Sequence, residues 1–230
     1  MKLYGFQKTT LLDFPNRVAS TVFTGGCNFR CPFCHNGSLV LHPSEEVPTD
    51  QVLAFAKKRA GILDGICITG GEPTLHADLP DFIDQLRALG LAIKLDTNGT
   101  NPAILGKLLA EGKLDYVAMD IKNCKEKYAA TIGLADFDLA PILESMRLLR
   151  ESGVAYEFRT TAVAELHTPT DFAAIGAWIT GAPAYYIQNF VDSGNLITKG
   201  LHALSIEDMQ ACLAAVLPFV PNAALRGVSV

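Results

Sequence analysis

The stretch from Gly65 to Asp96, GICITGGEPTLHADLPDFIDQLRALGLAIKLD, holds one complete strand–helix–strand unit. Its first apolar run, Gly65–Thr69, and its last, Ala92–Asp96, have the nearly continuous aliphatic character of strands that are buried on both faces. Between them, Leu79–Leu89 carries apolar residues at helical spacing and ends at Gly90, a typical helix terminator. Parallel strands need such a crossover, so this stretch predicts an α/β fold with a parallel sheet.

The same alternation extends along the chain in both directions. Further strands are expected at Val18–Phe23, Tyr116–Ile121, Ala155–Thr161 and Ala184–Gln188, and further helices near Thr49–Ala60, Pro102–Glu111, Pro141–Ser152 and Thr170–Thr180. A last helix, at about 205–220, opens with a capping-box pattern at Ser205 and Asp208. No linker divides the sequence, so we expect one domain over residues 1–230 with a core at about 16–190. Six units are fewer than the eight of a full barrel, which takes about 250 residues.

Composition and charge exclude several classes of protein. Of the 230 residues, 49% are apolar and 19% are charged, with a net charge of −5, so the chain can bury a large core. Its one basic run, residues 57–59 (KKR), is the solvated face of a helix or a docking patch for an acidic electron carrier, and it is too small for nucleic-acid binding. The most apolar stretch, residues 172–187, is broken by Gly181 and Pro183 and is too short to span a membrane. The first residues lack a secretory signal pattern, so we expect a cytoplasmic protein.

Three cysteines lie within eight residues of one another in the segment GGCNFRCPFCHN, residues 25–36. The thiolates of Cys27, Cys31 and Cys34 can each bind one iron of a cluster, leaving a fourth iron open to an exogenous ligand. They can alternatively hold one structural zinc ion with His35 as the fourth ligand. The remaining cysteines are isolated and are interpreted as small apolar residues or bystanders: Cys67, Cys124 and Cys212.

Polar residues follow several of the predicted strands. Gly70 and Gly71 allow a ligand to approach the backbone, and Glu72 can accept a hydrogen bond from a substrate ammonium group. Asp96 and Asp120 lie at further strand ends. Because functional groups collect at the carboxyl ends of parallel strands, we expect these residues and the cysteines to share one edge of the sheet.

The cysteine spacing C-x3-C-x2-C, with an aromatic residue before the last cysteine, resembles the hallmark of the radical S-adenosylmethionine (SAM) superfamily. The segments CPFCHN, GGEPTL, DTNG and AMDIK in series are similar to glycyl-radical-enzyme activating enzymes. Within that family the chain most resembles the activating proteins of anaerobic ribonucleoside-triphosphate reductase, and it is related to pyruvate formate-lyase activating enzyme. The similarity runs from about Gly5 to about Phe190, and it implies a partial (β/α)6 barrel in a single domain, open on one side to a protein partner.

The resemblance implies a reaction as well as a fold. Cys27, Cys31 and Cys34 would bind one 4Fe–4S cluster, whose open iron chelates SAM. Reductive cleavage of SAM gives methionine and a 5′-deoxyadenosyl radical, which takes hydrogen from a backbone glycine of a glycyl radical enzyme. The expected partner is anaerobic ribonucleotide reductase, and the expected electron donor is reduced flavodoxin or ferredoxin.

Further roles follow from the resemblance position by position. The implied SAM contacts, with Phe33 at the adenine and the glycines and Glu72 at the ammonium group, are Phe33, Gly70, Gly71, Glu72, Asp96, Thr97, Asp120, Lys122 and Arg159. A monovalent cation beside the SAM carboxylate would be held by Asp96, Thr97, the carbonyl of Ala118, and Asp120. Asp13 matches an acid close to the incoming glycine loop, although it would also fit an ordinary turn. Arg159, in an otherwise apolar strand, could instead form a buried ion pair.

Two other functions stay open on the sequence. A radical SAM enzyme acting on a small molecule, as in deazaguanine synthesis, would share the cysteine loop and the GGEP turn. A non-catalytic iron–sulfur or zinc module would need only the cysteines. The segments DTNG, AMDIK and EFRTT favour the activating enzyme. The remaining histidines have no metal-ligand spacing and are expected at the surface or at helix caps: His42, His76, His167 and His202.

Overall fold

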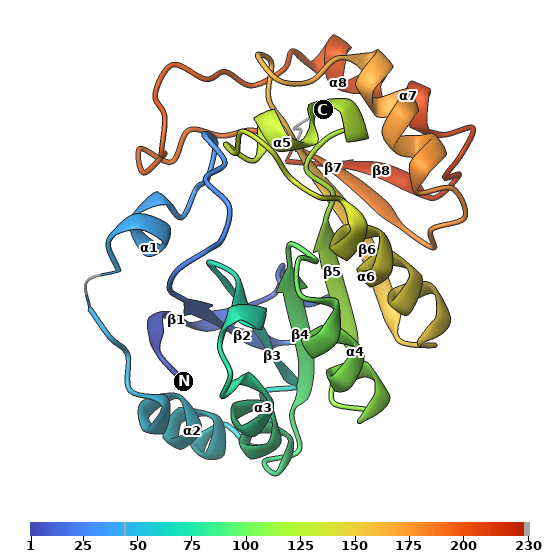
Figure 1. The fold of residues 1–230 in the computed structure, drawn as a ribbon. Coiled ribbons are helices and arrows are strands. Elements are labelled where there is room, and N and C mark those ends of the chain that lie inside the picture. The colour runs from blue at the N-terminus through green and yellow to red at the C-terminus, as the bar shows by residue number, and fades with distance from the viewer. Residues whose placement is uncertain (44, 228–230) are drawn as a thin grey trace. The chain divides into compact units, whose positions relative to one another are not determined.

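The fold is that of a computed structural model that describes residues 1–43 and 45–227. Residues 44 and 228–230 of the predicted 1–230 domain lie outside the described residues. One sheet contains all the strands of the described part, in the order β1 (Leu3–Thr10), β2 (Ala19–Thr24), β3 (Gly65–Gly70), β4 (Ala92–Thr97), β5 (Tyr116–Asp120), β6 (Ala155–Ala162), β7 (Tyr185–Asn189) and β8 (Ala223–Arg226) (Figure 1).

Helices connect the parallel strands. They are α1 (Gly37–Leu41), α2 (Thr49–Lys58), α3 (Leu79–Arg87), α4 (Pro102–Ala110), α5 (Tyr128–Thr131), α6 (Ala140–Glu151), α7 (Pro169–Trp178) and α8 (Ile206–Val216), with short 3-10 turns at Pro73–Leu75 and Lys125–Lys127. All the predicted helices are present, together with two short ones, α1 and α5, that were not predicted. Among the described residues, no helix combines the length and the apolar character needed to cross a bilayer. The α/β fold class is confirmed.

Two edge strands, β1 and β8, were not expected. The β1 sequence, LYGFQKTT, is polar over much of its length and pairs antiparallel with β2, with Leu3 opposite Thr24 and Thr10 opposite Ala19. A strand on the edge of a sheet is only partly buried and therefore lacks the continuous apolar run that marked the other strands. The four residues of β8 are too few to produce a recognisable pattern.

Contacts group the described residues into two compact units. The first comprises Met1–Asn28, Ser38–Ala118 and Ala140–Ala155, and the second comprises Phe29–Gly37, Met119–Leu139 and the chain from Tyr156 onward. The cysteine loop is divided between them, because Cys27 belongs to the first unit and Cys31 and Cys34 to the second.

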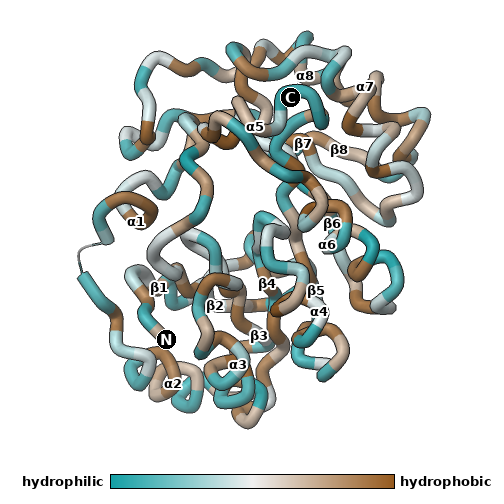
Figure 2. Tube along the Cα trace, in the orientation of Figure 1, coloured by the Kyte–Doolittle hydropathy of each residue, from teal (hydrophilic) through white to brown (hydrophobic). Residues whose placement is uncertain are grey.

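In the first unit, β2, β3 and β4 are parallel and in register. Ala19 pairs with Gly65 and Gly65 pairs with Ala92, so the carboxyl ends of the three strands meet at one edge. Successive side chains alternate between the faces of a strand, and one face of β3 presents the fully buried Ile66 and Ile68. Helices α2 and α3 lie side by side (Figure 1). Hydrophilic and hydrophobic residues alternate along each of these helices, as Figure 2 shows. This alternation lets each helix bury one face.

In the second unit, β6, β7 and β8 are also parallel, and helices α7 and α8 lie side by side (Figure 1). The predicted cap at Ser205 is confirmed, since its hydroxyl accepts a hydrogen bond from the Asp208 amide at 3.0 Å. The short β8 strand is also attached by an ion pair. Arg226 donates two hydrogen bonds, at 2.7 and 2.9 Å, to the buried carboxylate of Glu157 on β6, and its guanidinium lies 3.3 Å from the Tyr186 ring centroid.

Replacing Arg226 by Met should lower the free energy of unfolding by about 2–3 kcal/mol, because it leaves the Glu157 carboxylate buried without its cation. The Glu157 side chain is 1% exposed and that of Arg226 is 34% exposed, so the loss should be smaller than for a fully buried pair. Urea unfolding measures it. Arg147→Met is the matched control, because Arg147 pairs with Glu144 on the surface and its loss should leave stability nearly unchanged. Equal losses in the two variants would contradict the role assigned to Arg226.

Candidate functional site

The turn after β3 is attached to the beginning of the cysteine loop through the backbone. The Gly71 amide donates to the Thr24 carbonyl and the Glu72 amide to the Gly26 carbonyl, both at 2.8 Å. A Cβ atom at Gly71 would overlap the Gly26 carbonyl oxygen, so only glycine allows this approach. Gly26 itself has a φ of 75°. The GGE turn and the Cys27 segment are therefore held together as one rigid piece.

The carboxylate of Glu72 joins this turn to the loop after β4. It is 1% exposed and accepts four hydrogen bonds. Its Oε1 accepts from the amide and hydroxyl of Thr74 at 3.1 and 2.5 Å and from the Thr97 hydroxyl at 2.7 Å. Its Oε2 accepts from the Asn98 amide at 2.7 Å. Burial raises the pKa of Glu72, although these hydrogen bonds oppose the rise. The structure thus gives Glu72 a role in fixing two loops, and its contact with the SAM ammonium group stays a prediction.

Asn98 extends this network to the first cysteine. Its Nδ2 donates to the Asn28 side-chain oxygen at 2.9 Å and lies 3.8 Å from the Cys27 sulfur. Its side-chain oxygen accepts from the Thr100 amide at 3.0 Å, which fixes the orientation of the amide group. The sequence interpretation did not assign a role to Asn98. Its position in D-T-N-G, directly after a strand end, was the available signal.

Lys94 is a second residue that the sequence interpretation missed. It lies two residues before Asp96 on β4, so both side chains point to the same face of the sheet. Its ammonium group forms an ion pair with the Asp96 carboxylate and lies 3.7 Å from the Cys67 sulfur. The side chain is 3% exposed. A lysine within an apolar strand was the signal, of the same kind that singled out Arg159.

In the second unit, the remaining cysteine segment is fixed by backbone contacts. The Arg30 amide donates to the Ile132 carbonyl at 2.8 Å, and the Thr198 amide donates to the Pro32 carbonyl at 2.9 Å. A side chain at Gly133 would overlap the Arg30 carbonyl. The two aromatic side chains of this segment, Phe29 and Phe33, are both buried. Burial raises the pKa of the Cys34 thiol, while the Asn36 amide and the Lys122 ammonium lower it.

Asp120, Lys122 and Arg159 form a charged group in the second unit. The carboxylate of Asp120 accepts from Lys122 Nζ at 2.8 Å and from Arg159 Nε at 3.2 Å. Burial alone would lower the pKa of Lys122, but the Asp120 and Cys31 charges outweigh it and raise the pKa above its usual value. Lys122 therefore carries a positive charge close to Cys31. The ion pair that the sequence analysis gave as the alternative role of Arg159 is present, with Asp120 as its partner.

The three cysteines are divided between the two units, with Cys27 in the first and Cys31 and Cys34 in the second. None of the three is in a disulfide. Among residues 1–43 and 45–227, no group of three or more His, Cys, Asp or Glu side chains is close enough to hold one metal ion. In a 4Fe–4S cluster each thiolate binds a different iron, so the three cysteines supply the donor set that such a cluster needs, and this assignment stays a prediction. Burial lowers the pKa of His35, whose ring lies against Phe190.

The expectation that His167 lies at the surface or at a helix cap is wrong. The side chain is buried, accepts a hydrogen bond at Nδ1 from the Val163 amide at 3.2 Å, and lies 2.9 Å through Nε2 from the Lys122 carbonyl. Because a carbonyl only accepts, Nε2 carries the proton and the ring is neutral. Burial is the main cause that lowers the pKa of His167. The histidine thus fixes the backbone of the segment that carries Lys122.

Asp13 lies at the other end of β2 from Cys27. Its carboxylate accepts from the Thr21 hydroxyl at 2.5 Å, and Thr21 pairs with Cys67 on β3. The loop that contains Asp13 joins the end of β1 to the start of β2, at the amino ends of the parallel strands. Its expected proximity to a glycine loop stays a prediction.

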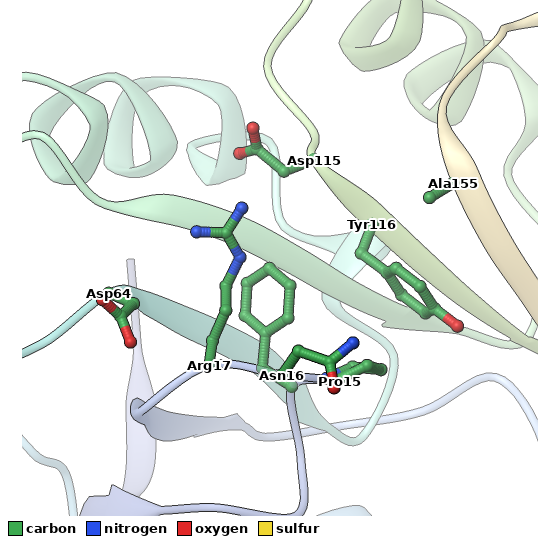
Figure 3. Close-up of a pocket in the computed structure, with 8 residues that line it drawn as sticks. Pro15, Asn16, Arg17, Asp64, Asp115, Tyr116 and Ala155 are labelled. Carbon is green, nitrogen blue, oxygen red and sulfur yellow. The ribbon is translucent and has the colours of Figure 1, made fainter.

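A pocket of about 440 Å³ lies at these amino ends, between the β1–β2 loop and the starts of β3, β5 and β6 (Figure 3). The Arg17 guanidinium carbon lies 5.2 Å from the centroid of the Phe14 ring. Figure 3 shows the Arg17 side chain extending toward Asp115. The lining residues are Phe14, Pro15, Asn16, Arg17, Asp64, Asp115, Tyr116 and Ala155. None of the predicted site residues belongs to this set. The pocket is therefore separate from the strand ends that carry Cys27, Gly70 and Asp96.

Comparison with known proteins identifies the family to which the chain belongs. Residues 21–165 match the model of the Radical SAM superfamily. A protein of Methanocaldococcus jannaschii, provisionally named a glycyl-radical enzyme activating enzyme, is 31% identical over 195 residues, which cover 81% of this chain and 78% of that protein.

Two solved structures share the fold. A domain of pyruvate-formate lyase-activating enzyme from Bacteroides vulgatus aligns with a TM-score of 0.58 and 17% identity, over 71% of this chain and 99% of that one. Streptococcus suis SuiB aligns with a TM-score of 0.73 and 14% identity, over 94% of this chain and 50% of that one. Together with the strand order, these matches confirm the radical SAM fold class.

The Glu72→Gln variant should lose about 2–3 kcal/mol of unfolding free energy. One carboxylate oxygen becomes an NH2 group, which then faces another donor, either the Asn98 amide or the groups of Thr74 and Thr97. Urea unfolding without cluster or SAM isolates this structural role from any ligand contact. Glu46→Gln, at an exposed position, is the control and should leave stability unchanged. A loss below about 0.5 kcal/mol in Glu72→Gln would show that the carboxylate does not anchor the two loops.

His167 should make stability depend on pH. Its folded pKa is depressed below the unfolded value of about 6.5, so below that pH the unfolded chain binds a proton that the folded chain does not. The unfolding free energy should therefore fall on acidification, by at most about 1.4 kcal/mol per pH unit from this residue. Urea unfolding between about pH 5 and 7.5 should show a shallower decline in His167→Gln than in the wild type. His42→Gln, at an exposed histidine, should keep the wild-type slope; identical slopes for all three proteins would contradict the account.

Proposed function

The chain belongs to the radical SAM superfamily, and on this basis we propose that it is an activating enzyme that installs a glycyl radical on a partner protein. The observation that carries the proposal is the 31% identity to the provisionally named activating enzyme, over most of both chains. The sequence series CPFCHN, GGEPTL, DTNG and AMDIK supports the same conclusion.

In this proposal Cys27, Cys31 and Cys34 hold one 4Fe–4S cluster. When bound and reduced, the cluster supplies the electron that cleaves SAM into methionine and a 5′-deoxyadenosyl radical. The buried Phe29 and Phe33 keep water away from the cysteine segment. Backbone contacts fix Gly26 within the first unit and Arg30 within the second before any ligand binds.

The remaining predicted contacts have distinct roles in the proposal. Gly70 and Gly71 leave room for the methionine end of SAM at the end of β3. Lys122 and Arg159 supply positive charge for the SAM carboxylate or ribose, and the raised pKa of Lys122 keeps its ammonium group charged. Phe33 contributes backbone groups to the adenine. Asp13 is assigned to the glycine loop of the partner from the resemblance alone, since it lies at the amino ends of the strands, at the other end of β2 from Cys27.

The protein substrate in this proposal is a glycyl radical enzyme, with anaerobic ribonucleotide reductase as the first candidate. The reaction removes one hydrogen atom from a backbone glycine and transfers it to the 5′-deoxyadenosyl radical, giving 5′-deoxyadenosine. Each turnover therefore requires one electron, which reduced flavodoxin or ferredoxin would supply. The basic run at residues 57–59, at the end of α2, is an acceptable contact for such acidic carriers.

The test is anaerobic reconstitution with iron and sulfide, followed by dithionite, SAM and mass detection of 5′-deoxyadenosine. We expect about four irons per chain and product formation. Alanine at Cys27, Cys31 or Cys34 should abolish the product. Cys212→Ala is the matched control, because Cys212 is a buried cysteine of α8 outside the three-cysteine segment, and its replacement should leave both iron content and product unchanged.

The result that would overturn the proposal is a fully loaded protein that binds iron through the three cysteines and forms no 5′-deoxyadenosine. The chain would then be a cluster carrier. Product formation that proceeds with a small molecule and leaves the partner glycine unchanged would instead identify a radical SAM enzyme of a different class.

A further inference from the structure

We propose that the ammonium group of Lys94 takes the place of the monovalent cation expected at Asp96, so that this chain binds SAM without a sodium or potassium ion. A carboxylate at the expected position needs a compensating positive charge when SAM brings a second carboxylate close to it. The structure supplies that charge from the protein itself.

The position of Lys94 follows from the strand. Lys94 and Asp96 are two residues apart on β4 and share one face, and Lys94 pairs in register with Cys67 on β3. The ammonium group forms its ion pair with Asp96 and contacts the Cys67 sulfur at 3.7 Å. The side chains of Lys94 and Asp96 are 3% and 14% exposed, so neither is a mobile surface group. The pair is built into the sheet.

The other two side chains that were expected to bind the cation, those of Thr97 and Asp120, are also engaged. The Thr97 hydroxyl donates to Glu72 at 2.7 Å and accepts from the Gly99 amide at 3.1 Å, so it is turned toward the buried network. In the second unit, Asp120 has Lys122 and Arg159 as its own cations. A metal ion at Asp96 would lie close to the Lys94 ammonium, and two like charges at such short range repel each other. The side chains that were expected to bind a cation are therefore satisfied by the protein.

Two consequences can be measured separately. The wild-type protein should show no saturable binding of sodium or potassium, and this consequence does not depend on the reaction. SAM affinity should be the same in potassium chloride, sodium chloride and choline chloride at equal ionic strength. This second consequence rests on the proposed function.

The experiment compares the wild type with Lys94→Met, Lys94→Arg and the control Lys113→Met. Lys113 also pairs with an aspartate, Asp84 at 2.6 Å, but outside the predicted site. The first readout is the thermal midpoint of the cluster-free chain in the three salts. The second is SAM binding to the anaerobically reconstituted protein by equilibrium dialysis.

We expect the wild type, Lys94→Arg and Lys113→Met to be indifferent to the identity of the cation in both readouts. Lys94→Met should bind SAM about tenfold more weakly in choline chloride and recover in potassium or sodium chloride. A saturable stabilisation of the wild-type chain by potassium or sodium, or tighter SAM binding in one of these salts, would overturn the inference. If Lys94→Met does not fold, the salt series on the wild type and on Lys94→Arg still decides. Absence of SAM binding in every salt would count against the proposed function, and the thermal readout would then decide this inference alone.

Discussion

The buried carboxylate of Glu72 is the interaction on which the arrangement of the first unit depends. It accepts hydrogen bonds from Thr74 in its own turn, from Thr97 at the end of β4 and from Asn98 in the loop that follows. Its own amide is bound to Gly26 in the cysteine segment. Because a buried carboxylate is costly unless its hydrogen bonds are satisfied, these three loops can adopt essentially one arrangement together. The position of Cys27 is thus fixed by the folding of the chain before any cluster binds.

The carboxylates near the strand ends are neutralised by cations of the protein itself. Each of the two strand-end aspartates has a cation within its own unit: Asp96 has Lys94, and Asp120 has Lys122 with Arg159. A neutral pair costs less to bury than a lone carboxylate. The negative SAM carboxylate would then meet positive or balanced groups. His167 contributes indirectly, because it holds the backbone of Lys122 in place.

The sequence predicted the regular part of the fold well. Strands β2 to β7 and helices α2, α3, α4, α6, α7 and α8 have patterns that depend on local periodicity, which is visible in a single sequence. The edge strands β1 and β8 depend on pairing with distant residues and gave no such pattern. Among the candidate site residues, the cysteines and glycines were singled out because the proposed chemistry needs those residue types. Lys94, Asn98 and His167 were missed because their roles arise from contacts that only the folded chain creates.

The most direct test of the central claim follows the hydrogen atom. A candidate glycyl radical enzyme labelled with α-deuterated glycine is incubated anaerobically with the reconstituted chain, a reductant and SAM. Deuterium in the 5′-deoxyadenosine, together with a glycyl radical signal in the electron paramagnetic resonance spectrum of the partner, is the predicted result. Unlabelled 5′-deoxyadenosine, with no radical on anaerobic ribonucleotide reductase or any other glycyl radical enzyme supplied, would contradict it.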